Sequence, residues 1–158
     1  MLDATELRVM ELASRQSGYV TRRQSIACGM SADAIDRRVN SKRWSRIKPG
    51  LYLVSGYSPS TRGLLVAATA TLGAVVSHES AAEMHDLPGT TRGLAVVTVR
   101  VRSTHRFPDV IVHQLTDLTD DQVVEVEAMP VTSPIRTGVD LAAHLDPPRS
   151  AESSITLS

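Results

Sequence analysis

Residues 18–54 contain two helix starts with a glycine corner between them and a hairpin directly after, GYVTRRQSIACGMSADAIDRRVNSKRWSRIKPGLYLV. The motif Thr21-Arg22-Arg23-Gln24 fits a capping box, in which Thr and Gln satisfy backbone N–H groups reciprocally. The helix that starts there ends at Gly29, because glycine tolerates the left-handed conformation of a tight corner. Ser31 is a suitable N-cap for the next helix. This order is typical of a helix-turn-helix.

The residues that follow predict a wing. Residues 44–47 and 51–54 have strand character, and the Pro49-Gly50 pair between them favours a turn. We expect three apolar side chains of this hairpin to face inward: Ile47, Leu51 and Leu53. Trp44 is interpreted as an apolar anchor between helix and hairpin. With an amphipathic helix over residues 5–16, the pattern predicts a winged helix-turn-helix.

The remaining residues predict a second, small α+β domain with antiparallel strands. Helices are expected at 64–72, 77–89 and 136–145, and strands at 94–102, 110–115 and 123–127. Alternation of valine with polar residues in the first of these strands predicts a sheet with one solvated face. The predicted division is a DNA-binding domain over 1–56, an α+β domain over 60–146 and a polar tail over 147–158.

Charge separates the two parts, although the whole chain is neutral. Residues 1–50 hold ten Lys or Arg and five Asp or Glu, whereas the rest holds seven and twelve. A basic module joined to an acidic one is consistent with a first part that binds phosphates. An ordinary solvated surface is the alternative reading of the same charges.

The helix after Ser31 predicts the DNA contacts. Helical periodicity places Ala32, Ile35 and Val39 on one side and Arg37, Asn40 and Ser41, with Asp33, on the other. Arg and Asn side chains bind base edges in the major groove in pairs of hydrogen bonds. We therefore expect base contacts from Arg37, Asn40 and Ser41, and phosphate contacts from Arg22, Arg23, Arg38, Lys42, Arg46 and Lys48. Thr21, Ser31 and Arg43 complete the predicted DNA-binding set. A surface helix with ordinary charges is the competing interpretation.

Composition excludes several other classes. Cys28 is the only cysteine, so an intrachain disulfide and a zinc site built on cysteine pairs are excluded. One Phe, one Trp and three Tyr are too few for a sheet that stacks RNA bases. The acidic N-terminus does not resemble a secretory signal, and no apolar run has the length of a membrane span. We expect a cytoplasmic protein without membrane contact.

Two alternative functions remain open. His78 and His85 share a helix face near Glu79 and Glu83, from which a metal-dependent hydrolase site could be drawn. No third ligand is fixed, and the glycine patterns of a nucleophile elbow or a phosphate-binding loop are absent. We therefore expect no enzyme activity, no cofactor and no metal. A protein-interaction module is the other alternative.

Three blocks in this order, TRRQSIACGMSADAIDRRVNSKRWSRIKPGLYLVSG, SHESAAEMHDLPG and MPVTSPIRTGVDLA, resemble the AbiEi family of antitoxins from type IV toxin–antitoxin systems. The likeness covers about residues 5–145. It implies a winged helix-turn-helix that represses its own operon by binding promoter repeats, and a domain that opposes a nucleotidyltransferase-like toxin without a stable complex. Members usually continue well past the helix that holds Arg136 and Asp140, so repression is the more direct expectation.

The predicted partners follow from this resemblance and from the small size of the winged domain. A single winged domain reads a short half-site, so selectivity normally takes two copies. We expect two chains on a repeated operator, with self-association on DNA and the acidic part held away from it. Operator repeats alone could also bring the two copies together.

Overall fold

A computed structural model describes residues 1–101 and 106–145. The polar tail expected at 147–158 lies outside the described residues. The helices are α1 (Ala4–Arg15), α2 (Arg22–Ala27), α3 (Ala32–Asn40), α4 (Thr61–Leu72), α5 (His78–Met84), the 3-10 turn η1 (Asp120–Gln122) and α6 (Pro134–Leu145). The strands are β1 (Tyr19–Thr21), β2 (Trp44–Lys48), β3 (Leu51–Val54), β4 (Val75–Val76), β5 (Val96–Val99), β6 (Ile111–Gln114), β7 (Val123–Val126) and β8 (Met129–Thr132). The predicted α+β class is confirmed.

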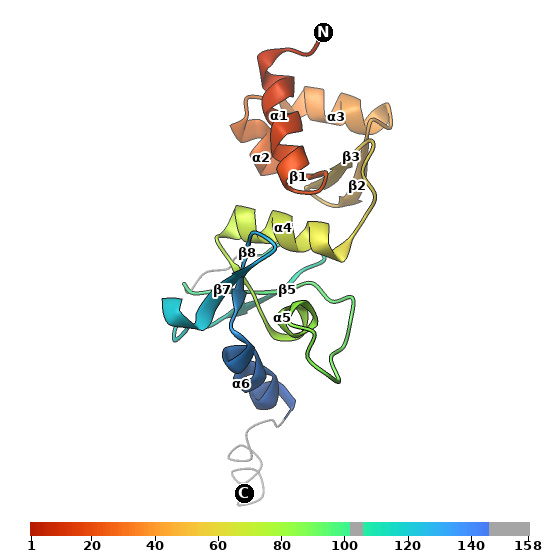
Figure 1. The fold of residues 1–158 in the computed structure, drawn as a ribbon. Helices are drawn as coiled ribbons and strands as arrows, with labels where there is room; N and C mark the ends of the chain where they lie inside the picture. Colours follow the sequence, from red (N-terminus) through yellow and green to blue (C-terminus); the bar gives the residue numbers. More distant parts are fainter. Residues whose placement is uncertain (102–105, 146–158) are drawn as a thin grey trace, which may run out of the picture.

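The elements are stacked in layers along the molecule (Figure 1). Helices α1, α2 and α3 lie on one side of the sheet β1-β3-β2, and α4 lies on its other side. The five-stranded sheet β6-β5-β4-β8-β7 follows, with α5 and α6 beyond it. Helix α4 therefore packs between the two sheets.

The first three helices and the first sheet have the arrangement expected of a winged helix. The Thr21 side chain accepts from the Gln24 backbone N–H at 3.0 Å, and the Gln24 side chain accepts from the Thr21 backbone N–H at 3.0 Å, which confirms the capping box. Ser31 caps α3 through the Ala34 N–H. The hairpin turns at Pro49 and Gly50, and Gly50 has a φ of +80° that favours glycine.

Strand β3 is buried along its whole length because both faces of the first sheet are covered. Tyr52 and Val54 join Trp44 in a cluster under the three helices, as expected for the tryptophan. Leu51 and Leu53 belong to a second cluster, which includes Leu65 of α4 and several valines of the five-stranded sheet, among them Val97 and Val131. The inward side of the hairpin is thus part of a core shared with the second half of the chain.

Strand β1 was not predicted as a strand. It is three residues long and pairs antiparallel with β3, Val20 lying opposite Tyr52. A three-residue segment is too short for periodicity to distinguish a strand from a connecting loop, so only its pairing partner defines it.

The second sheet is mixed. Pairs β4–β5 and β7–β8 are antiparallel, as expected, whereas β4–β8 and β5–β6 are parallel. The expected solvated face is absent from β5, where all four residues are buried because α4 covers one face and α5 the other. The three valines of β5 suit burial on both faces. Thr98 is also buried there because its hydroxyl donates a hydrogen bond to Ser77 Oγ at 2.7 Å.

The predicted boundary near residue 57 falls between the end of β3 at Val54 and the start of α4 at Thr61. The division into separate domains stays a prediction. Within the described residues, every helix is too short or too polar to cross a lipid bilayer.

Candidate nucleic-acid interface

Helix α3 presents one side to the core and the other to solvent. Ile35 is fully buried and Val39 is partly buried against the same cluster. Asp33, Arg37 and Asn40 are exposed on the opposite side. Ala32 was expected among the buried residues but is exposed, because it occupies the first position of the helix, beyond the packed surface.

A polar groove runs beside this exposed side, between α3, the start of α2 and the hairpin. It encloses about 480 Å³. Side chains from all three elements meet there, since the groove is lined by Arg22, Asp36, Val39, Asn40, Arg46, Gly50 and Tyr52. The hairpin and helix α3 thus form the two walls of one depression.

Arg22 is held in this groove by neighbouring side chains. Its Nη1 donates to Asp36 Oδ1 at 3.2 Å and lies 3.3 Å from the Tyr52 hydroxyl. The hydrogen bond with Tyr52, followed by that with Asp36, raises the pKa of Arg22. The guanidinium remains partly exposed, at 37% for its side chain, and therefore offers a fixed positive charge to a groove ligand.

Four further cations of the predicted set are exposed and make no ion pair within residues 1–101 and 106–145. They are Arg23 on α2, Arg37 on α3, Lys42 after α3 and Arg46 on β2. Lys42 has a φ of +63°, so the chain turns sharply at the end of the helix. These residues and Arg22 place positive charge on the helices and the hairpin.

The other three cations of the set are paired within the protein. Arg38 points to α1, where its Nη2 lies 2.5 Å from Glu6 Oε1, and its side chain is only 15% exposed. Arg43 Nη2 lies 3.6 Å from the same oxygen. Lys48 Nζ lies 3.4 Å from Asp109 Oδ1, which belongs to the second part of the chain. The structure therefore separates these three residues from the groove cations.

The hydroxyl groups among the predicted DNA-binding residues form hydrogen bonds at the ends of helices. Thr21 is buried at the start of α2, and Ser31 caps α3. Ser41 Oγ donates to the Arg38 carbonyl at 3.2 Å at the end of α3. Ser31 and Ser41 are exposed, whereas Thr21 is turned inward.

Two groove residues escaped the sequence analysis. Tyr52 was read only as part of a strand, and its hydroxyl reaches the groove because β3 is the central strand beside Arg22. Asp36 follows Asp33 by three positions on α3, and that spacing could have placed it on the exposed face. Its carboxylate partly offsets the positive charge of the groove.

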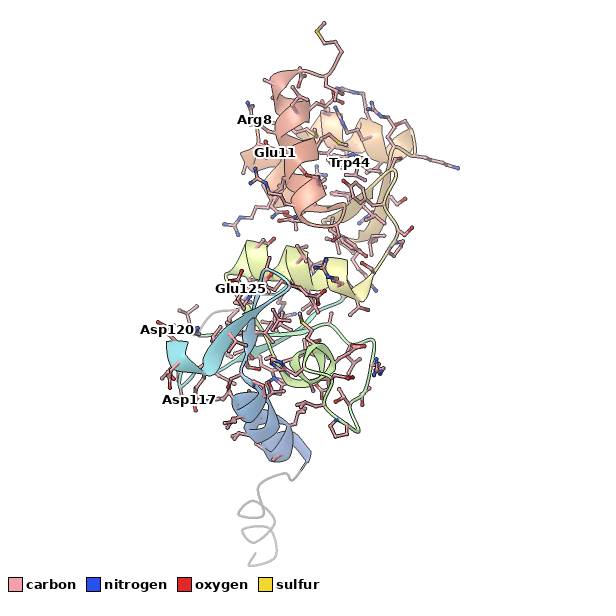
Figure 2. The ribbon with its side chains drawn as sticks, viewed as in Figure 1. Arg8, Glu11, Trp44, Asp117, Asp120 and Glu125 are labelled. Carbon is pink, nitrogen blue, oxygen red and sulfur yellow. The ribbon has the colours of Figure 1, made fainter. Side chains whose placement is uncertain are left out.

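Residues 51–158 hold twelve of the seventeen Asp and Glu residues, against five in residues 1–50. Figure 2 shows Trp44 within the winged helix, whereas Asp117, Asp120 and Glu125 lie around η1 and β7 of the five-stranded sheet. The charge difference between the two halves of the sequence is thus a separation in space.

His78 and His85 have different partners. The His78 ring stacks on His113 with centroids 4.1 Å apart and bonds Ser77 Oγ through Nδ1 at 2.9 Å. His85 Nε2 bonds the Thr132 carbonyl at 2.7 Å. In the part of the chain that the structure describes, no three His, Cys, Asp or Glu residues are grouped to hold a metal ion.

A comparison with known families places the matched segment in the winged helix. Residues 7–55, from α1 to the end of the hairpin, match a family described as "Transcriptional regulator, AbiEi antitoxin". No curated protein matches the chain. The matched segment contains the whole groove between α3 and the hairpin. The N-terminal winged helix is therefore similar to that of the AbiEi antitoxin family of transcriptional regulators, which supports a DNA-binding regulator.

Proposed function

We propose that this chain represses its own type IV toxin–antitoxin operon by binding repeated sites in the promoter. The observation that carries the proposal is the groove between α3 and the hairpin, together with nearby cations that make no ion pair within the described residues. The match of residues 7–55 to a family of transcriptional regulators supports it. A cytoplasmic site of action belongs to the proposal, because the operator is there.

In the proposed complex, α3 enters the major groove and Arg37 and Asn40 contact base edges. Both side chains are exposed on the same side of the helix, and these residue types bind guanine and adenine through paired hydrogen bonds. Ser41 lies at the end of the same face. Arg22, Arg23, Lys42 and Arg46 contact phosphates from the flanking elements, and Lys48 joins them when DNA draws it from Asp109. Arg38 is left out of this contact set because Glu6 and the Ala34 carbonyl already bind it.

The proposal assigns DNA binding to residues 1–56 and an antitoxin role to residues 60–146. The acidic side chains around η1 and β7 favour a second part that is held away from the phosphates. Two chains on two repeats would supply the selectivity that one small winged domain lacks. The second part would oppose a nucleotidyltransferase-like toxin, with or without direct contact.

A gel-shift titration tests repression most directly. The probes are a duplex from the region upstream of the gene and a scrambled duplex of equal length, each over a series of salt concentrations. We expect tighter binding to the upstream duplex and a linear loss of affinity with the logarithm of salt concentration. Equal and salt-insensitive affinity for both duplexes would contradict DNA recognition.

The antitoxin role and the pairing on DNA need separate measurements. Growth of cells that express the cognate toxin, with and without this chain, tests the antitoxin role. The number of chains bound to duplexes with one or two repeats tests the pairing. One chain per two-repeat duplex at saturation would exclude pairing.

A protein-interaction module is the second candidate, and one observation favours it. Ile135 and Val139 of α6 are 82% and 57% exposed, although buried Arg136 and Asp140 lie on the inner side of the same helix. Apolar side chains that face solvent one turn apart are typical of a contact surface. If deletion of residues 1–56 leaves the cellular phenotype unchanged, this candidate replaces repression.

A further inference from the structure

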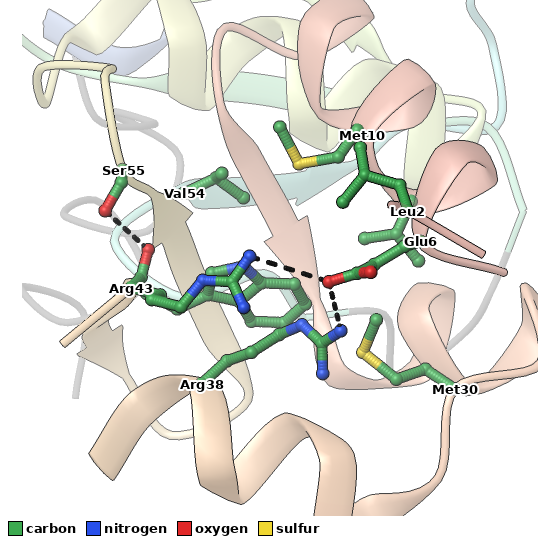
Figure 3. A pocket seen from close by; sticks show the side chains of 10 residues that line it. Leu2, Glu6, Met10, Met30, Arg38, Arg43, Val54 and Ser55 are labelled. Carbon is green, nitrogen blue, oxygen red and sulfur yellow. Dashed lines mark hydrogen bonds and ion pairs between the residues drawn. The ribbon is translucent and has the colours of Figure 1, made fainter. Parts of the chain in front are cut away.

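A cavity of about 270 Å³ lies on the side of the winged helix where α1 meets the end of the hairpin. Helix α1, Met30 in the turn before α3, Arg38 of α3 and the two hairpin strands all contribute to its wall (Figure 3). It is separate from the groove beside α3, because the two share no lining residue. Neither the family match nor the proposed repression assigns a role to it.

The inner wall of this cavity is apolar. Val9, Met30, Trp44 and Val54 line it, and each is at most 5% exposed. Met10 lies at the rim and is 37% exposed, so a bound apolar group would cover it. Small-molecule sites are typically apolar pockets with a few placed polar groups, and methionine adapts to irregular ligands.

The polar end of the cavity has more positive than negative charge. Glu6 Oε1 faces both Arg38 and Arg43, and Figure 3 shows the two guanidinium groups converging on it. Arg38 is bound by Glu6 at 2.5 Å and by the Ala34 carbonyl at 2.9 Å. One carboxylate against two guanidinium groups leaves one net positive charge.

Arg43 carries that surplus charge. Its contact to Glu6 is 3.6 Å, longer than a hydrogen bond, and its side chain is 61% exposed. The Ser55 backbone N–H at 2.9 Å and the Ser55 hydroxyl at 2.7 Å donate to the Arg43 carbonyl. The backbone is thus fixed while the guanidinium donors remain available to an anion at the mouth of the cavity.

We propose that this cavity binds a small organic monoanion, a carboxylate with a compact aryl or branched alkyl group. The apolar group would lie against Trp44 and the two methionines, and the carboxylate would accept hydrogen bonds from Arg43. The volume lies just below the usual range for ligand sites, roughly 300–1,000 Å³, which favours a compact ligand.

Occupancy is coupled to DNA binding, and this part rests on the proposed function. Arg38 lies in the last turn of α3 and Arg43 follows that helix, so both adjoin the proposed contacts Arg37, Asn40 and Lys42. A ligand that draws Arg43 from Glu6 leaves this carboxylate to Arg38 alone and so changes the ion pair that joins the end of α3 to α1. By linkage, DNA and the ligand change each other's affinity by the same factor.

Trp44 provides the test, because it is the only tryptophan of the chain and it lines the cavity. The probes are phenylacetate, benzylamine and benzyl alcohol, which compare an anion, a cation and an uncharged group on the same ring. We expect saturable change of Trp44 emission with phenylacetate at about tenfold lower concentration than with either of the others. Equal response to all three, or no saturable response, overturns the proposal.

Two variants test whether the positive charge of Arg43 selects the anion. Arg43→Gln should weaken phenylacetate binding about tenfold and leave benzyl alcohol binding unchanged. Loss of both would mean that the substitution distorted the cavity and that Arg43 does not select the anion. Arg15→Gln is the matched control, because Arg15 is an exposed arginine of α1 that pairs with Glu11 and lies outside the cavity. An equal loss in this control overturns the assignment.

Further measurements distinguish ligand binding from self-association and test the coupling to DNA. Trp44 emission that depends on protein concentration instead of phenylacetate would assign the cavity to a second copy of the chain and overturn ligand binding. A change in affinity for the upstream duplex in saturating phenylacetate supports the coupling, and unchanged affinity overturns it. If the protein binds no DNA, the proposed function fails, while the Trp44 titration still decides the ligand site.

Discussion

Gly63 of α4 lies against the ring of Tyr19, close enough that a Cβ atom at position 63 would lie 2.7 Å from Tyr19 Cε2. The Tyr19 hydroxyl also accepts from the Ser60 backbone N–H at 3.2 Å. Tyr19 belongs to the first sheet and Gly63 to the helix between the two sheets. This contact brings the winged helix and the second part of the chain together at the start of α4.

Gly63→Ala should destabilise the protein by roughly 1–3 kcal/mol, because overpacking at a close contact outweighs the helix propensity gained from alanine. Urea denaturation measures the loss. Gly138→Ala is the matched control in a second helix, since nothing lies within 4 Å of its added Cβ. That variant should be neutral or more stable. Equal changes in the free energy of unfolding for the two variants would show that the Tyr19 ring moves aside without destabilising the protein.

Arg37→Ala should weaken binding to the upstream duplex by about 1–3 kcal/mol and reduce discrimination between base pairs. The reason is that Arg37 is exposed on α3 and makes no ion pair within the described residues. Gel-shift titrations on single-base variants of the duplex measure the effect. Arg15→Ala is the control and should leave the affinity unchanged, because its side chain lies on α1 beside Glu11. A uniform loss on every duplex would make Arg37 a phosphate contact.

Asp109→Asn should strengthen binding to all duplexes alike, because it releases Lys48 from an ion pair at 3.4 Å. Lys48→Ala should weaken all duplexes alike and reduce the salt slope by about 1. The slope of affinity against salt concentration measures both effects. If neither substitution changes the slope, the wing tip does not contact DNA.

Glu6→Gln should destabilise the winged helix by roughly 1–3 kcal/mol, because it leaves Arg38 without its carboxylate partner. Both side chains are only 15% exposed, so water replaces the lost partner poorly. A double-mutant cycle with Arg38→Gln, followed by thermal denaturation, isolates the interaction between the pair. Strictly additive effects would mean that the pair contributes nothing beyond its separate contacts.

A cluster around Arg136 predicts a pH dependence. The Arg136 side chain, which is 9% exposed, donates to Asp140 Oδ1 at 2.9 Å and to Asp117 Oδ1 at 3.2 Å. Hydrogen bonding to Arg136, followed by its charge, lowers the pKa of Asp117. Burial lowers the pKa of Arg136, but Asp117 and Asp140 outweigh it and raise that pKa.

Because the pKa of Asp117 is lower in the folded state, its contribution to stability is present above the unfolded value of 3.8 and is lost as pH falls through the folded value. Carboxyl NMR titration of Asp117 should show a midpoint below 3.8. In Arg136→Gln the midpoint should rise toward that value. An unchanged midpoint in this variant would show that Arg136 is not the cause.

The capped helix starts were predictable because their signals are local. Thr21 with Gln24, and Ser31, make the bonds that their spacing implies. The hairpin was predictable for the same reason, since Pro49 and Gly50 define its turn within four residues. The order of helices and hairpin therefore followed from short-range chemistry.

The pairing of strands that lie far apart in the sequence was harder to predict. The parallel pairing of β4 with β8 joins Val76 to Val131, and no local pattern encodes such a separation. The candidate site shows the same limit. Periodicity placed Arg37 and Asn40 outward on α3, but it also placed Arg38 at a phosphate, because the partner Glu6 lies 32 positions away.

The cluster that joins Leu51 and Leu53 to Leu65 and to the second sheet couples the unfolding of the two ends of the molecule. Because α4 is shared, melting of the second sheet would expose the underside of the first, and the chain should unfold in one cooperative transition. A ligand that binds only the folded protein raises its stability by an amount set by ligand concentration over Kd. Operator DNA held by α3 should therefore slow amide hydrogen exchange in β5, a strand that it never touches.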